Sequence, residues 1–182
     1  MPRTQALLAA LIAPGSIEAD LGNVQAALFS VHGLASALAL PPLVPLAFLD
    51  AAASVRGLLT ELNRAVISGW RMRLAGAAWA DGHLYAGIES DGAWHALRSR
   101  VLEMRGPETG CLFPVVEGFY LGCAESRPED RPGIRPAIPG ASFSSCTIAL
   151  IGLRTVFDGS AWWRDVSWEV LDERPLRGRK EP

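Results

Sequence analysis

The chain has 182 residues, a length that suits one ordinary domain or two small lobes that share a core. Hydrophobic residues make up 49% of it and charged residues 20%, so it can bury a sizeable interior and is not a disordered chain. Its 17 Lys and Arg residues against 19 Asp and Glu residues give a formal net charge of -2, which excludes a global field that attracts nucleic acid or acidic membranes. Any phosphate binding must therefore be local.

The cysteines and apolar stretches indicate where the protein works. Cys111, Cys123 and Cys146 are widely spaced, so they form neither a disulfide framework nor a C-x-x-C site, and we expect a reducing cytoplasm. The apolar run 6–13 resembles the core of a short signal peptide, and a first buried strand fits it equally well. The stretch 34–49 is short for a membrane span and contains three prolines, so we expect no transmembrane segment and no membrane partner.

The first half of the chain alternates strand and helix patterns. An unbroken apolar run predicts a strand at 5–13. Apolar residues at three- and four-residue steps predict a helix over 17–31, which Gly33 is placed to end. A strand interrupted by prolines follows at 38–49, and a second helix is expected over 52–67.

The pattern in the middle of the chain predicts a β-hairpin followed by a helix. Apolar and arginine residues alternate over 70–74, and Asp81-Gly82 then separates this strand from a second one at 83–88. A third helix is expected over 93–104, where apolar residues fall on one helical face.

The last third contains the remaining strands. Residues 113–123 are rich in β-formers, whereas 127–140 contains four prolines and is expected to be an irregular loop. Strands at 143–157 and 162–173 flank Asp158-Gly159, which predicts a closing hairpin.

The order of these elements resembles the 2H phosphoesterases, and more narrowly the bacterial 2′-5′ RNA ligase and cyclic phosphodiesterase branch. Four segments carry the resemblance: Pro45-Leu-Ala-Phe-Leu49, Trp70-Arg-Met-Arg-Leu74, His83-Leu-Tyr-Ala-Gly-Ile88 and Cys146-Thr-Ile-Ala-Leu150. The resemblance implies an α+β fold: two pseudo-symmetric lobes of antiparallel sheet, with helices packed outside and a central cleft. One two-lobed domain would span 1–176, and 177–182 would be a flexible tail.

Members of this family carry a His-x-Thr or His-x-Ser motif on a central strand of each lobe. One histidine acts as general base and the other as general acid on a cyclic phosphodiester, and the hydroxyls bind phosphate oxygens. Residues i and i+2 of a strand share a face, so the imidazole and the hydroxyl reach the same phosphate. Laid on this chain, the first motif falls on Leu43-Val44-Pro45 and the second on Ser145-Cys146-Thr147. Both histidines are then missing and only Thr147 persists, so we expect no catalytic residue.

No other residues form a replacement catalytic or metal centre. His32, His83 and His95 have neither the motif spacing nor a metal-ligand spacing, so we interpret each as structural or exposed and expect no metal or cofactor. His83 would need a partner to act at the cleft mouth. Cys146 is out of phase with Ser145, which points the thiol to the opposite, buried face.

Two further features have both a functional and a structural interpretation. Arg71 and Arg73 share one strand face, and they either grip phosphate beside Ser145 and Thr147 or form a solvated surface. Aromatic residues of the same hairpin, Tyr85 and Trp79, either stack a base or belong to the core.

We therefore expect a cleft with Leu43 and Pro45 on one wall and Ser145 and Thr147 on the other. The main hypothesis is a catalytically degenerate binding or structural module, with a nucleotide or an RNA end as the candidate ligand. One alternative is a weak or rewired cyclic phosphodiesterase or 2′-5′ RNA ligase-like enzyme that uses a remaining histidine with an arginine. The other is a protein-interaction domain whose cleft is filled by its own side chains. Nothing in the sequence indicates an oligomeric state.

Overall fold

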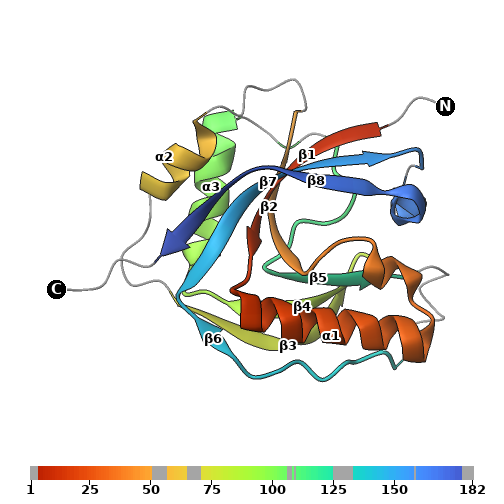
Figure 1. Cartoon of the computed structure of the whole chain (residues 1–182). Helices are drawn as coiled ribbons and strands as arrows, with labels where there is room; N and C mark the ends of the chain where they lie inside the picture. The colour runs from red at the N-terminus through yellow and green to blue at the C-terminus, as the bar shows by residue number, and fades with distance from the viewer. Residues whose placement is uncertain are drawn as a thin grey trace.

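The computed structural model describes residues 4–50, 57–64, 71–105, 108, 110–124, 133–157 and 159–177. Two four-stranded antiparallel sheets form the body of the molecule, with strand orders β2-β1-β7-β8 and β5-β4-β3-β6 (Figure 1). The first sheet contains β1 (Thr4–Ile12), β2 (Leu43–Leu49), β7 (Ser145–Thr155) and β8 (Ser167–Arg177). The second contains β3 (Met72–Ala80), β4 (His83–Glu89), β5 (Gly118–Cys123) and β6 (Ser142–Phe143). The predicted α+β architecture of two antiparallel lobes is confirmed.

In the part of the chain that the structure describes, three α-helices and two short 3-10 helices connect the strands. They are α1 (Gly15–His32), η1 (Ala35–Leu38), α2 (Leu58–Arg64), α3 (Ala93–Arg105) and η3 (Gly159–Asp165). Gly33 ends α1 in the left-handed conformation, at φ 66°, as predicted. Asp81 and Gly82 also have positive φ, at 42° and 83°, and form the two-residue turn between β3 and β4.

Several element boundaries differ from those predicted. Prolines 41 and 42 precede β2, so this strand begins at Leu43 instead of residue 38. The segment 162–165 belongs to η3, so β8 begins at Ser167, and it continues through Arg177, which was expected in the tail. Residues 51–56, 65–70 and 178–182, on which parts of the second helix, the hairpin and the tail were predicted, lie outside the described residues.

Helices α1 and α3 each follow a strand of one sheet but pack against the other sheet. Helix α1 follows β1 of the first sheet but packs against β5 of the second. Helix α3 follows β4 of the second sheet but packs against β2 of the first, where α2 also contacts β7 and β8 (Figure 1). Each sheet therefore buries one face against a helix from the other half of the chain, and one hydrophobic core cluster contains residues of both lobes.

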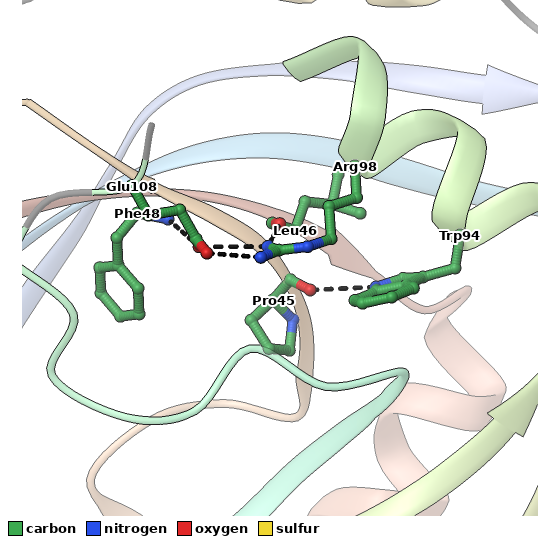
Figure 2. Close-up of polar contacts among 6 residues, drawn as sticks. All are labelled: Pro45, Leu46, Phe48, Trp94, Arg98 and Glu108. Carbon is green, nitrogen blue, oxygen red and sulfur yellow. Dashed lines mark hydrogen bonds and ion pairs between the residues drawn. The ribbon is translucent and has the colours of Figure 1, made fainter. Parts of the chain in front are cut away.

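The outer edge of β2 is bound by α3 and the segment after it (Figure 2). A register shift between Ala9 and Ala10 leaves Leu46 as an extra residue in β2. The indole Nε1 of Trp94 donates to the carbonyl of Pro45 at 3.0 Å, just before this bulge. A buried carbonyl on an unpaired strand edge needs such a donor, because water cannot reach it.

An ion pair completes this edge. The guanidinium of Arg98 donates to the carbonyl of Leu46 and to the carboxylate of Glu108. The same carboxylate accepts the backbone N–H of Phe48 at 3.1 Å. The side chains of Arg98 and Glu108 are only 23% and 20% exposed, so their mutual attraction is weakly screened.

The edge of β5 is bound in return by the first lobe. The amide of Gln25, on α1, donates to the carbonyls of Tyr120 and Leu40 at 3.2 and 3.1 Å. The hydroxyl of Ser36, in η1, donates to the Cys123 carbonyl at 2.6 Å and accepts the Cys123 N–H at 3.0 Å. Strands β2 and β5 thus meet at the lobe junction without pairing, each bound by side chains of the opposite lobe.

We predict that Arg98→Met lowers the free energy of unfolding by about 2–3 kcal/mol, because it leaves the Glu108 carboxylate and the Leu46 carbonyl buried without their donor. Urea denaturation measures this loss. Arg100→Met is the matched control on the same helix: its partner Glu103 and Arg100 itself are about half exposed, so the loss is about 0.5 kcal/mol or less. Equal losses for the two variants would contradict a role of Arg98 in joining the lobes.

Candidate functional site

The positions of the expected first motif line the face of the first sheet that looks toward the second sheet. Ile12 of β1 lies opposite Leu43 on one side and opposite Thr147 on the other, so these three residues form one row across the sheet. Pro45 and Ser145 lie on the same face, since each is two residues from a member of the row. The prediction that Ser145 and Thr147 form the opposite wall is therefore wrong: both belong to the same sheet as Leu43, with β1 between them.

The wall that faces Leu43 is strand β5. The unit β4-α3-β5 repeats the order strand, helix, strand of β1-α1-β2, so Gly118 at the start of β5 corresponds to Leu43 at the start of β2. Two residues further, Tyr120 corresponds to Pro45. The four residues Leu43, Pro45, Gly118 and Tyr120 are all buried, and Leu43 and Tyr120 belong to the same hydrophobic core cluster. The repeated order of predicted elements is the signal in the sequence that could have pointed to β5.

Gly118 leaves no room for a side chain. A Cβ built there would lie 2.9 Å from the carbonyl oxygen of Ala86 and 3.1 Å from the Cβ of Tyr85. The nearer contact is with rigid backbone of the neighbouring strand, so it cannot be relieved by a side-chain rotation. An imidazole at this position would require β4 to move.

Aromatic side chains fill the space between the two sheets beside this position. The ring of Phe113 lies 5.0 Å from that of Trp162, 5.4 Å from that of Tyr120 and 5.0 Å from that of Phe48, measured between centroids. Trp162 and Tyr120 are fully buried. These separations are typical of packed aromatic pairs, so this part of the cleft is a second hydrophobic core.

His83 belongs to this packed interior. Its ring is buried, its Nδ1 lies 3.0 Å from the carbonyl oxygen of Asp81, and the indole Nε1 of Trp162 donates to its Nε2 at 3.4 Å. A neutral imidazole with its proton on Nδ1 satisfies both contacts. These contacts agree with the structural interpretation of His83. His32 and His95 are exposed, which was the other expectation for these histidines. Among the described residues, no group of three or more His, Cys, Asp and Glu side chains has the arrangement of a metal site.

Tyr85 lies in the core and has no free ring face on the surface. It is 2% exposed, its hydroxyl donates to the carbonyl of Pro114 at 2.7 Å, and burial raises its pKa well above the ordinary value of 10.0. Trp79 is half-buried, and its indole Nε1 donates to the carbonyl of Ile134 at 3.3 Å. Base stacking on Tyr85 would thus require the core to open.

Arg73 is paired within its own sheet. Its guanidinium Nε donates to the carboxylate of Glu89 on β4 at 3.0 Å, and this partner raises the pKa of Arg73 above its ordinary value. Both side chains are exposed, as is Arg71 before the strand. Arg73 lies opposite Ser142 of β6. Ser142 is three residues before Ser145, so this pairing brings Arg73 toward the start of β7, the strand that carries the hydroxyls of Ser145 and Thr147. The Glu89 carboxylate offsets its charge there.

The packed cleft predicts a large loss of stability for Trp162→Ala. Removing a fully buried indole should lower the free energy of unfolding by about 3–5 kcal/mol, because the neighbouring rings cannot close the cavity. Trp168→Ala is the control: this indole is 44% exposed, and its removal should cost clearly less. Chemical denaturation of both variants checks the difference, and a Trp162→Ala variant as stable as the control would show that the cleft is not packed.

The thiols of Cys111 and Cys146 should differ in reactivity. Burial raises the pKa of the Cys146 thiol to about 12, and it also raises the pKa of Cys111, which nevertheless is exposed. A raised pKa means less thiolate at pH 8, so we expect iodoacetamide to label Cys111 more slowly than an unperturbed thiol and to leave Cys146 unlabelled. Labelling of Cys111 should accelerate from pH 8 to pH 10, and unfolding in urea should expose Cys146. Mass spectrometry of peptides checks this, and rapid native labelling of Cys146 would contradict its buried placement.

Comparison with known proteins identifies the fold. No family model and no curated protein sequence matches the chain. Among solved structures, E. coli LigT in its apo form is 15% identical, with a TM-score of 0.60 over 97% of this chain and 99% of LigT. The structure of E. coli LigT complexed with 3′-AMP is also 15% identical, with a TM-score of 0.56 over 95% and 98% of the two chains. No helix in the described ranges has the length and apolar character needed to cross a membrane. The chain therefore has the fold of E. coli LigT, and the expected α+β architecture is confirmed.

Proposed function

We propose that this protein is a catalytically degenerate 2H phosphoesterase-like module that acts by binding, and that it binds through its outer surface. The chemistry of the two facing strands supports this. Leu43, Pro45 and Gly118 carry no group that exchanges a proton, and the hydroxyl of Tyr120 donates to the carbonyl of Ser36 at 3.2 Å inside the core. Each general acid or base contributes about 10²–10⁴ to the rate, so a cleft without both lacks the acid–base part of the mechanism.

The packing of the cleft is the single observation that carries this proposal. A nucleotide needs a concave site that can enclose a planar base and expose donors to a phosphate. Here the rings of Phe113, Tyr120 and Trp162 pack against one another in that space, and His83 makes its contacts within the same cluster. These contacts favour the protein-interaction alternative, in which the fold presents outer surfaces and the cleft serves as core.

Nucleotide or RNA-end binding is the second candidate. The structure of E. coli LigT complexed with 3′-AMP supports it, because this chain shares that fold. Within this chain the supporting groups are the exposed hydroxyl of Ser145 and the half-buried hydroxyl of Thr147, on the face that looks into the cleft. We also propose a cytoplasmic location, in agreement with three free cysteines.

We predict that the protein neither hydrolyses adenosine 2′,3′-cyclic phosphate nor shows saturable binding of 3′-AMP, because the cleft is packed. Chromatography of the reaction products and isothermal titration calorimetry measure the two properties. Trp162→Ala provides the comparison, since it removes the largest ring from the cleft. Binding of 3′-AMP to this variant and not to the parent would identify the packing as the reason for exclusion.

The other outcomes distinguish the alternatives. Saturable binding of 3′-AMP without turnover by the parent protein would support the nucleotide-binding module. Turnover of the cyclic phosphate would support a rewired enzyme, and its loss in His83→Ala or His95→Ala would then identify the histidine that acts. Either result would overturn the interaction module.

A further inference from the structure

Strand β8 is an open sheet edge of unusual length. It has 11 residues and lies at the end of the first sheet, and no strand within the described ranges pairs with its outer side. Residues 167–171 and 173–175 are exposed, so both faces of the strand are accessible along most of its length. A row of unpaired backbone N–H and C=O groups of this kind is a template for another strand.

The edge also carries apolar surface. Trp168, Val170 and Leu171 are 44%, 41% and 50% exposed, and Phe157, two residues after the end of β7, is 40% exposed. Exposed apolar residues that gather on one edge are typical of an interaction site, whereas isolated ones are not. The strand therefore offers both backbone hydrogen bonds and apolar contacts to a partner.

The order of charges along β8 identifies a second copy of the chain as the partner. Acidic residues come first and a basic residue follows: Glu169, Asp172 and Glu173, then Arg174. An antiparallel second copy can place an acidic residue of one strand opposite a basic residue of the other, and a two-fold axis repeats this contact. A parallel copy would instead bring like charges together.

The faces of the strand select the register. Glu169 lies opposite Gly152 and Arg174 opposite Ile148, so both point to the face of the even-numbered residues of β7. They share this face although they are five residues apart, because a bulge at Leu171 adds one residue to β8. Directly opposed residues of paired strands must share a face, and the pair Glu169 and Arg174 meets this condition with opposite charges.

We propose that two copies of this chain associate through β8 in antiparallel orientation, with Glu169 of each opposite Arg174 of the other. Val170 then lies opposite Glu173, and Trp168 lies opposite Pro175, which lacks an N–H and ends the new ladder. In the single chain, Glu169 contacts Arg154 at 2.9 Å and Arg174 contacts Asp172 at 3.6 Å, and these exposed ion pairs are weak enough to rearrange. The two-fold pairing covers the open β8 edge of each copy, so the assembly closes as a dimer and does not grow into a fibre.

Charge reversal tests this pairing. We expect the parent protein to sediment as a dimer, and Glu169→Arg or Arg174→Glu alone to weaken association about tenfold or more, because each places like charges opposite one another twice. An equimolar mixture of the two variants should recover a dimer, since every opposed pair is then again an Arg with a Glu. The double variant Glu169→Arg/Arg174→Glu should also dimerise.

Arg100→Glu, on the exposed side of α3, is the control and should leave the dimer unchanged. Circular dichroism verifies that all variants are folded. A monomeric parent protein, single variants that remain dimeric, or a mixture that stays monomeric would each overturn the proposal. The dimer goes beyond the proposed function and does not depend on it. Nucleotide turnover by a dimer would overturn the catalytically inactive module and leave the dimer proposal standing. A monomer without nucleotide activity would overturn the dimer proposal and leave the inactive module standing.

Discussion

The exchange of hydrogen-bond partners at the lobe junction holds this fold together. Strands β2 and β5 are the ends of two separate sheets, and each would bury unpaired backbone groups where the sheets meet. Arg98 and Glu108 satisfy the edge of β2 from the second lobe, while Gln25 and Ser36 satisfy the edge of β5 from the first. Each lobe thus supplies the hydrogen-bond partners that the strand edge of the other lobe needs.

This close junction determines what the cleft can do. Because β2 and β5 are held against each other, the space between the sheets is narrow, and Phe113 and Trp162 enter it from two connecting segments. The resulting core stabilises the fold by excluding water. His83 is then an acceptor for an indole N–H within a packed interior. The fold of E. coli LigT is retained with a cleft whose contacts are those of a hydrophobic core.

The strand that carries Leu43 and Pro45 could be placed from the sequence, and the wall opposite it could not. Leu43 and Pro45 lie in a continuous apolar strand whose place in the chain is clear, and their side chains lie on the inner face of the first sheet. Ser145 and Thr147 have the right spacing for a shared strand face and do share one. The spacing does not reveal which sheet a strand joins, and β7 joins β1 beside β2. The opposite wall, strand β5 with Gly118, carries no His, Ser or Thr that a motif search would find.

Local patterns in the sequence were sufficient for most elements, because hydrophobic periodicity and turn residues act over a few neighbouring positions. The left-handed Gly33 at the end of α1 and the Asp81-Gly82 turn are examples, and both follow from backbone sterics alone. Periodicity shows that a face is buried, but it does not name what buries it. The exchange of α1 and α3 between the sheets, the packing of Trp162 into the cleft and the open edge of β8 depend on contacts between residues far apart in the chain, so only the tertiary structure decided them.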